Sequence, residues 1–594
     1  MRSFWKLISS PNFLPVLIVL FFGVLASRHL FTSGYFKMHD DLQMMRQLEM
    51  EKCFLDLQIP CRWVPDMGYG YGFPLFNFYP PFPYLVGEGI RVTGTSFVDT
   101  VKLNFALSII VSGIAMYFLA KEFFGRIGGV LSAVFYIWAP YHAVDVYVRG
   151  ALNEAWALAW FPLIFFYSYK LITNHKTQIT KSVIFLALSW FALLTSHNLI
   201  VLIFIPLFAS WCLLFLAREK AWNRLPHLFI VGVLALGLAA FFTLPALFEN
   251  KFTQVRSQLT GYYEYTAHFV SLRQLLISRF WGYGPSVWVD AEDGMSFQIG
   301  HVHWVLSLLV GAILLIKIWF KRGRNFWREL LSDKLFVVTS YLLTVGWFSA
   351  FLTHLRSIFI YQAVPQLGYI QFPWRFLTIV IFAFSFIVGI IPGVVAELKS
   401  RLGFWVKILI TPPQIFISIL LVLLLVALNW NYFKPEGGKM GPLTDKEKFS
   451  GAAWELQQTA GIYDYLPISA KTAPKGPPQG LVELLNGNVD IRDERSGTNW
   501  AEFTTDVESD GAFFRFNILN FPGWKVYVDG REGLVTTQDD ELGRIHFEVA
   551  MPGVHKVRAE LTDTWPRTLG NLISSISWVG LVIYFYSHRK SANV

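Results

Sequence analysis

Long apolar runs separated by short polar connections make up most of this chain. A transmembrane helix needs about 20 mostly apolar residues to cross about 30 Å of hydrocarbon, and the pattern predicts twelve such spans. The third and the fifth are short and reach full length only through weakly polar neighbours. The predicted spans are Phe13–Leu30, Thr100–Leu119, Ile127–Tyr141, Ala151–Ile172, Ser182–Thr195, Leu199–Ala217, Leu228–Phe248, Val302–Ile318, Leu335–Leu352, Phe376–Val395, Phe404–Trp430 and Leu569–Tyr586.

A different pattern appears before the last span. From Phe513 to Leu561 apolar and polar residues alternate, and Pro-Gly, Asp-Gly and Leu-Gly pairs separate the runs. Alternation with turn residues between the runs predicts short antiparallel strands. The preceding stretch, Asn431–Pro478, is rich in Gly, Pro and Lys and is predicted to be mostly connector. We therefore expect a small β-sandwich between the eleventh and twelfth spans.

These patterns divide the chain into three parts. Residues 1–430 form a transmembrane domain with two long outer connections, 31–99 and 249–301. Residues 431–567 form an extracytoplasmic β-rich domain, and residues 568–594 hold the final span and a cytoplasmic tail. The fold class predicted is thus a polytopic α-helical membrane protein of about twelve helices.

Charge placement predicts the orientation. Only 15% of residues are charged, against about 25% in soluble domains. The short connections on one side hold 21 Lys and Arg, whereas those on the other side hold only Arg149, Arg356 and Arg375. Because cytoplasmic loops carry this excess, both termini should be cytoplasmic. The net charge of +9 is then mostly topogenic and indicates no nucleic-acid partner. The first span resembles a signal peptide, but its longer apolar core favours retention.

All three long segments outside the predicted membrane lie on the outer face. We find no sizeable cytoplasmic domain, no Gly-rich phosphate loop and no nucleotide motif. Any chemistry should therefore use substrates of the outer face, where ATP and nucleotide sugars are absent.

The first outer connection begins with His39, Asp40 and Asp41. Asp40 and Gln43 fit a capping box, in which the carboxylate accepts from free N–H groups at the start of a helix. Neighbouring helical residues diverge by about 100°, so Asp40 and Asp41 cannot both serve the same cap. One of the two acids is therefore available for another interaction. Capping alone and catalysis both remain open for Asp40 on this pattern.

Two further features of this connection attract attention. Tyr69 and Tyr71 are flanked by glycines and are candidates for stacking on a sugar or lipid, although an aromatic belt explains most nearby rings. Cys53 and Cys61 are the only cysteines on the outer face, and a disulfide between them is plausible in an oxidising compartment. Cys212 lies in an apolar span and is expected to be a packing residue.

Other polar residues cluster near the outer ends of spans. Asp145 and Arg149 are spaced to pair with each other along a helix. Glu154 lies a few residues into an apolar span, where a charge is costly, so it should face a polar cavity. His197, Arg279 and Arg375 are further candidates for substrate binding, and arginine is well suited to phosphate.

Several stretches resemble known families. An outward Asp pair after the first span resembles the GT-C class of membrane glycosyltransferases, which take sugars from lipid phosphates. The stretches MHDD, CRWVPDMGYGYGFPLFNFYPPFPY, RGALNEAWALAWFPL, DGMSFQIGHVHW, QFPWRFL, YDYLP and FPGWKVYVDG resemble the YfhO-like proteins and the bacterial membrane proteins labelled 6-pyruvoyl-tetrahydropterin-synthase-related. The pterin label finds no support, because we see no synthase domain or zinc-ligand cluster.

The resemblance implies roles for particular residues. Asp40, and Asp41 second, match the first-loop acid and would act as catalytic base. Arg149, Arg279 and Arg375 would cover the lipid phosphate, and His39, Tyr69, Tyr71, Glu154 and His197 complete the candidate substrate-binding set. No essential metal is expected; a divalent metal is the alternative.

The leading hypothesis is a glycosyltransferase of the bacterial inner membrane. It would move a sugar from a polyprenyl phosphate to an envelope glycan, lipid or protein acceptor, with retaining or inverting stereochemistry left open. The alternative is a transporter or non-catalytic assembly factor for lipid-linked envelope glycans. Polar residues concentrated at span ends rather than at the midplane favour the first.

Overall fold

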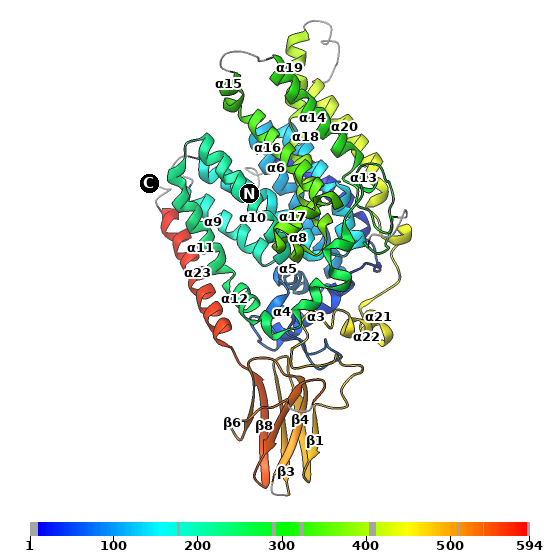
Figure 1. Ribbon diagram of the computed structural model, residues 1–594, viewed down its shortest axis with the longest axis vertical. Helices are drawn as coiled ribbons and strands as arrows, with labels where there is room; N and C mark the ends of the chain where they lie inside the picture. The colour runs from blue at the N-terminus through cyan, green and yellow to red at the C-terminus, as the bar shows by residue number, and fades with distance from the viewer. Residues whose placement is uncertain are drawn as a thin grey trace.

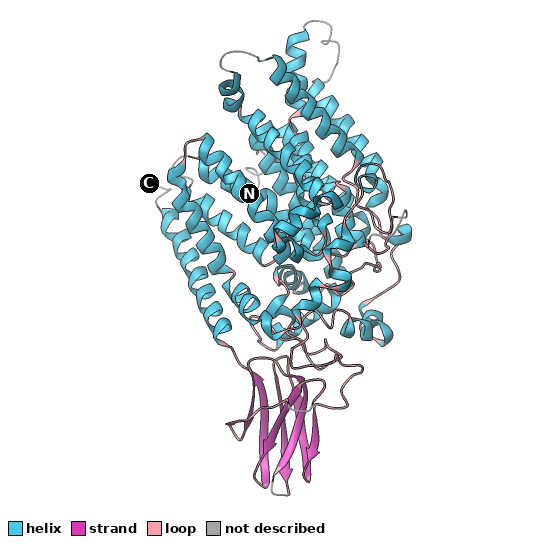
Figure 2. Ribbon diagram, viewed as in Figure 1, coloured by secondary structure: helices cyan, strands magenta, loops and turns pink. Residues whose placement is uncertain are grey.

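A computed structural model describes residues 10–174, 179–287, 293–320, 326–402, 412–508, 511–537 and 540–590. A bundle of long helices forms most of the molecule, and a β-sandwich projects from one end of it (Figures 1 and 2). We call this the sandwich end. The protein is therefore a polytopic helical membrane protein with a β domain before its last helix.

Eight helices among the described residues are long and apolar enough to cross a membrane. A ninth span is a pair of helices, Leu225–Leu238 (α11) and Ala240–Glu249 (α12), bent by 74° at the break between them. Two apolar helices are shorter, Phe13–Ala26 (α2) and Ile179–Leu194 (α9). The eight are α6 (Phe97–Ile137), α8 (Leu152–Thr173), α10 (Asn198–Arg218), α14 (His301–Phe320), α16 (Lys334–Leu352), α18 (Leu377–Val388, continued by flanking turns from Pro373 to Leu398), α20 (Pro413–Asn429) and α23 (Trp565–Lys590).

Helix α6 is two antiparallel halves rather than one straight rod. Gly125 has a φ of 69°, a left-handed conformation that interrupts the helix. Gly113 packs directly on the side chain of Ile137, and Gly129 packs on Tyr117. In a straight helix Gly113 and Ile137 would lie about 36 Å apart, at about 1.5 Å per residue. The halves correspond to the second and third predicted spans.

Each of the twelve predicted spans falls on a helix. They map to α2, the two halves of α6, α8, α9, α10, the α11–α12 pair, α14, α16, α18, α20 and α23. Residues 403–411, at the start of the predicted span Phe404–Trp430, lie outside the described residues. By length and composition, eight helices and the bent pair qualify as spans. The sequence predicts three more, because it counts the two halves of α6 separately and because it includes the short helices α2 and α9.

The first long connection folds against the bundle at its sandwich end. It contains α3 (Gln43–Leu55), α4 (Leu75–Phe78) and α5 (Phe82–Arg91). Polar and apolar residues of α3 are buried alike, because α5 and α6 pack against it. This helix is therefore part of the core and not a surface helix.

The remaining helices are short and join these elements. They are η1 (Arg28–Phe31), α7 (Pro140–Ala143), η2 (Val144–Val148), η4 (Trp222–Arg224), η5 (Asn250–Phe252), η6 (Val255–Leu259), η7 (Gly261–Tyr263), η8 (Tyr265–His268), α13 (Leu272–Leu276), α15 (Phe326–Ser332), η9 (Leu355–Ser357), α17 (Ile358–Ala363), η10 (Pro365–Ile370), η11 (Pro373–Phe376), α19 (Ile391–Leu402), η13 (Trp430–Tyr432), η14 (Glu436–Gly438), α21 (Asp445–Lys448) and α22 (Gly451–Thr459).

The β-sandwich consists of two antiparallel sheets. One has the strand order β1-β4-β7 and the other β2-β3-β8-β5-β6. Alternate residues point inward, so that Phe503, Phe514, Phe516 and Phe547 form an aromatic core. The strands are β1 (Val482–Asn486), β2 (Val489–Ser496), β3 (Trp500–Val507), β4 (Ala512–Leu519), β5 (Trp524–Val528), β6 (Arg531–Gly533), β7 (Arg544–Val549) and β8 (Gly553–Leu561). Three strands precede the stretch whose alternation predicted a sandwich.

A buried ion pair joins α12 to the start of α23, just after the last strand of the sandwich. Arg567, at the start of α23, lies 3.0 Å from a carboxylate oxygen of Glu249, at the end of α12, and both side chains are almost fully buried. Asn77 donates to the same carboxylate at 2.7 Å. Helix α23 then runs back along α11 and α12, away from the sandwich (Figure 1).

Candidate functional site

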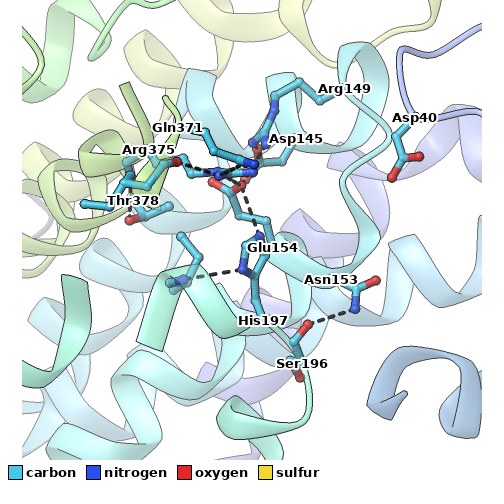
Figure 3. Close-up of polar contacts among 12 residues, drawn as sticks. Asp40, Asp145, Arg149, Asn153, Glu154, Ser196, His197, Gln371, Arg375 and Thr378 are labelled. Atoms are coloured by element: carbon cyan, nitrogen blue, oxygen red, sulfur yellow. Dashed lines mark hydrogen bonds and ion pairs between the residues drawn. The ribbon is translucent and has the colours of Figure 1, made fainter. Parts of the chain in front are cut away.

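A cavity of about 790 Å³ lies at the sandwich end of the bundle. Its walls come from the segment before α3, the α7–α8 and α9–α10 connections, η7, η11 and the turn after α22. These six parts of the chain, far apart in sequence, therefore meet here. Figure 3 shows polar contacts among side chains on its walls and behind them.

Asp40 is held at this cavity by the backbone. The His39 N–H donates to the Val148 carbonyl at 2.9 Å and the Asp40 N–H to the Arg149 carbonyl at 2.8 Å. The Asp40 carboxylate accepts from Arg46 at 2.7 Å and from Gln43 Nε2 at 3.0 Å. About a third of the Asp40 side chain stays exposed, while Arg46 is buried. A carboxylate at the cavity wall is thus fixed by a buried cation.

The capping interpretation of Asp40 is wrong. Helix α3 begins at Gln43, its N-cap is Leu42, and no side chain bonds to its free N–H groups. The Asp40 carboxylate binds the buried Arg46 guanidinium instead, because a partner with a full positive charge outweighs a neutral backbone N–H as donor.

Asp41 is engaged elsewhere. Its carboxylate pairs with Lys448, from α21, whose side chain is almost fully buried. Burial raises the pKa of Asp41, and Lys448 opposes that rise. The two adjacent acids thus point to different partners, as the divergence of neighbouring residues requires.

Glu154 lies at the centre of a buried charge cluster. Its side chain is fully buried at the start of α8. One of its carboxylate oxygens lies 2.8 Å from Arg149 Nη2 and 3.6 Å from Arg375 Nε. Tyr141 donates to the other oxygen at 2.6 Å. Two guanidinium groups therefore share one carboxylate on the cavity wall.

The surroundings fix both arginines. Arg149 also pairs with buried Asp145, and its guanidinium lies 4.4 Å from the ring centroid of Trp374. Arg375 donates to the Ile370 carbonyl at 2.7 Å and to Gln371 Oε1 at 3.1 Å. Asp145 belongs to η2, a π-helical turn, and such turns occur often at functional sites.

Two histidines lie at the cavity, and a hydrogen bond to the backbone holds the ring of each. His197 Nδ1 accepts from the Ile200 N–H at 3.3 Å and so caps α10. Burial, with Arg375 adding to it, lowers the pKa of His197 to about 3, so its ring is neutral at pH 7. His39 Nε2 lies 2.8 Å from the Tyr283 carbonyl oxygen, and burial lowers its pKa as well.

Most of the residues predicted for the site meet at this cavity. Those that line it are His39, Asp40, Asp41, Arg149, Glu154, His197 and Arg375. Sequence reasoning missed Arg46, Tyr79, Tyr263 and Asp464, which line it too. Tyr79 and Asp464 carried a signal, because they lie in the quoted stretches CRWVPDMGYGYGFPLFNFYPPFPY and YDYLP.

Three predicted residues lie away from the cavity. Tyr69 donates to Glu455 at 2.9 Å, and Tyr71 packs into the core of the sandwich. Arg279 is exposed and donates to the Leu428 carbonyl at 3.0 Å. These three residues therefore do not line this cavity, because they pack on the connector, on the sandwich and on α20.

The remaining candidate groups concern cysteines and metals. Cys53, near the end of α3, is joined to Cys61 by a disulfide, and Cys212 is free and buried. In the part of the chain that the structure describes, no group of three or more His, Cys, Asp or Glu side chains is placed to hold a metal ion.

Comparison with known proteins yields distant similarities. No protein-family profile matches the chain. An uncharacterized protein of Lactococcus lactis subsp. cremoris is 25% identical over 251 residues, which is 40% of either chain. The chain thus matches about two fifths of that relative's length.

Among solved structures, two align with most of this chain at low identity. The archaeal oligosaccharyltransferase AglB from Archaeoglobus fulgidus, in complex with an inhibitory peptide and a dolichol-phosphate, aligns with a TM-score of 0.42 and 12% identity, over 81% of this chain and 61% of its own. ArnT from Cupriavidus metallidurans, bound to undecaprenyl phosphate, aligns with a TM-score of 0.39 and 14% identity, over 70% of this chain and 72% of its own. At such TM-scores the correspondence is loose, and the chemistry has to be argued from the cavity itself.

Proposed function

We propose that this protein is a membrane glycosyltransferase that moves a sugar from a polyprenyl-phosphate donor to an acceptor hydroxyl. One observation carries the proposal. A single cavity at the sandwich end combines a partly exposed carboxylate, Asp40, with two guanidinium groups, Arg149 and Arg375. Attack on a sugar held by a phosphate leaving group needs a base and cationic cover for the phosphate.

Asp40 suits the base. Its bonds to Arg46 and Gln43 both fall on Oδ2, so that, among the described residues, Oδ1 is left to meet a hydroxyl. The proton of the acceptor hydroxyl passes to Asp40 as the acceptor oxygen bonds to the anomeric carbon. The bond between that carbon and the phosphate oxygen breaks, and polyprenyl phosphate leaves. General-base help of this kind contributes about 10²–10⁴-fold.

Arg149 and Arg375 suit the leaving group. A planar guanidinium binds phosphate through two parallel N–H bonds, and both arginines are rigidly held before any substrate arrives. Glu154 keeps the pair together by offsetting their mutual repulsion. The cluster is therefore built in advance for an anion, so little reorganisation accompanies binding.

The proposed setting follows from the charge pattern. In this proposal the protein lies in the bacterial plasma membrane, with both termini cytoplasmic and the sandwich extracytoplasmic. The cavity then opens on the outer face. An envelope glycan, lipid or protein would be the acceptor there. No cofactor is needed for the steps above.

The test uses a strain that lacks this gene. Wild-type protein, Asp40→Asn and a matched control, Asp490→Asn, are returned to it, and envelope glycans and lipid-linked sugars are measured by mass spectrometry. Asp490 forms an exposed ion pair with Arg492 on the sandwich. We expect wild type and Asp490→Asn to restore one sugar modification. Asp40→Asn should fold, lose at least about a hundredfold in turnover and accumulate the donor lipid.

Two results would overturn the proposal. Full restoration by Asp40→Asn would remove the carboxylate from the chemistry. Lipid-linked glycan trapped on the cytoplasmic leaflet of the deletion strain would favour the transporter or assembly factor, which needs no base.

A further inference from the structure

A second cavity, of about 570 Å³, lies between the first long connection and helices α12 and α23. We call it the lateral groove. Helix α3, the loop after it and the start of α5 form one wall, and α12 and α23, which lie along one edge of the bundle, form the other (Figure 1). Apart from Asn571, Ser574 and Ser575, the described residues that line it are apolar. Two of them, Ile59 and Val579, are more than half exposed, so the groove opens at the surface.

The depth of the lateral groove matches the hydrocarbon of a membrane. Helix α23 begins at Trp565, and the groove residues of this helix run from Asn571 to Val579, about 9–21 Å along it. These positions lie within the roughly 30 Å of hydrocarbon that such a helix crosses. Beside them, the apolar side chains of Leu572 and Ile576 are more than half exposed and would meet lipid chains. Hydrocarbon rather than water is therefore the natural content of the groove.

The wall of the groove is fixed where α11 and α12 meet. Ser574 Oγ, from α23, donates to the Gly237 carbonyl at 3.0 Å and accepts from the Phe241 N–H at 2.8 Å. Backbone groups at the 74° bend are thus paired inside the bundle. Irregular backbone at membrane depth is tolerated where it is buried in protein or lines a cavity. The groove is therefore built before any lipid arrives.

One short segment separates the lateral groove from the cavity that holds Asp40. Tyr79 and Pro80 line that cavity, and the next residue, Pro81, lines the groove. The Tyr79 hydroxyl accepts from Arg46 at 2.9 Å, and the same guanidinium binds Asp40 at 2.7 Å. A chain in the groove therefore ends beside the carboxylate that suits the base.

We propose that the lateral groove holds the hydrocarbon chain of the acceptor, and that the acceptor is a lipid with a hydroxyl-bearing headgroup. This inference rests on the proposed function and narrows its acceptor. The headgroup passes the segment at Tyr79 and enters the cavity. Its hydroxyl gives its proton to Asp40, and its oxygen bonds to the anomeric carbon as polyprenyl phosphate leaves.

The position of the groove favours the acceptor over the donor as its occupant. Arg149 and Arg375, which suit the donor phosphate, come from the α7–α8 connection and from η11, and neither element is among the described residues that line the groove. The groove instead adjoins the Tyr79 side of the cavity, where Arg46 holds Asp40. A transferase that joins a sugar from one lipid to another lipid needs a separate place for each chain. A soluble glycan would leave this apolar groove without a role.

The experiment fills the groove. Ser575→Trp and Val579→Trp each place an indole ring among its lining residues. Gly580→Trp is the matched control on the same helix, because a side chain there meets open space and Gly580 does not line the groove. Purified full-length protein is placed in nanodiscs made from the phospholipids and glycolipids of the deletion strain, and lipid-linked sugar from that strain is added as donor. Mass spectrometry measures glycosylated lipid and the free sugar released by hydrolysis.

The expected result is a change in the fate of the sugar. Wild type and Gly580→Trp should glycosylate a membrane lipid. Ser575→Trp and Val579→Trp should lower the ratio of lipid glycosylation to donor hydrolysis at least tenfold, because the acceptor chain loses its place while the donor site keeps its contacts. A higher mole fraction of the acceptor lipid should restore part of the rate, as a defect in binding requires. Thermal unfolding confirms that each variant is folded.

The outcomes separate the two proposals. Absence of both hydrolysis and transfer in wild type contradicts the proposed function. Hydrolysis without any glycosylated lipid contradicts the lipid acceptor alone. An equal fall of hydrolysis and transfer in both groove variants would mean that the groove holds the donor chain, and an unchanged ratio in both would mean that it holds neither; each result overturns the inference.

Discussion

Replacing Glu154 by Gln tests the buried charge cluster. The substitution removes one negative charge and keeps the oxygen that accepts from Tyr141 at 2.6 Å. Glu154 lies 2.8 Å from Arg149 and 3.6 Å from Arg375, and it is fully buried. Each such pair is worth about 4 kcal/mol at an effective dielectric of about 20. After desolvation is counted, breaking a buried pair costs about 3–5 kcal/mol.

We therefore expect Glu154→Gln to lower the free energy of unfolding by about 3–5 kcal/mol. The measurement is equilibrium unfolding in mixed micelles. Glu122→Gln is the matched control, since Glu122 forms a partly exposed ion pair with Lys170 at 2.6 Å. Loss of such a pair costs at most about 1 kcal/mol. Equal stability of the two variants would refute the reasoning.

Added lipid phosphate makes this test specific for an anion site. With Glu154 neutral, the arginine pair carries one uncompensated positive charge. Undecaprenyl phosphate should then stabilise Glu154→Gln by about 2.7 kcal/mol where its concentration is about 100 times its Kd for that variant, and it should stabilise wild type by less, because wild type binds it more weakly. An equal gain in both proteins would mean that Arg149 and Arg375 do not meet the phosphate.

Three further predictions concern the rest of the molecule. In intact cells an impermeant thiol reagent should label Gly530→Cys and not Lys220→Cys; the reverse would invert the topology. Cys53 and Cys61 should be alkylated only after reduction, and two freely reacting thiols would exclude the bridge. The raised pKa of Asp464, about 6, means that its stabilising contribution is complete below pH 4 and is lost as pH rises through 6. The free energy of unfolding of Asp464→Asn should not show this fall with rising pH. A pH profile of stability identical to that of wild type would contradict the prediction.

The sequence predicted the spans and part of the site because those signals are local. Twelve runs of suitable length were enough to find every long helix, including both halves of α6. Glu154 stood out because a carboxylate in an apolar helix is costly unless it faces polar groups. Its neighbours Arg149 and Arg375 stood out because they are the rare cations on the side where cations are scarce.

The errors have physical causes that no local pattern shows. Asp40 looked like a helix cap because Gln43 follows at the right spacing, yet buried Arg46 binds it instead. Tyr69 and Tyr71 looked like stacking residues because glycines flank them, yet their loop packs under the sandwich. Asp464 was missed as a site residue because only the folded connector brings it back to Asp40.

The two adjacent acids of the first connection show how the site is assembled. Asp41 binds Lys448 and so fixes the connector that carries Asp464 over the cavity. Asp40 binds Arg46 and keeps part of its carboxylate exposed to the cavity. On the proposed function the pair separates structure from chemistry: Asp41 holds the connector at the cavity through Lys448, and Asp40 is the acid that takes the proton.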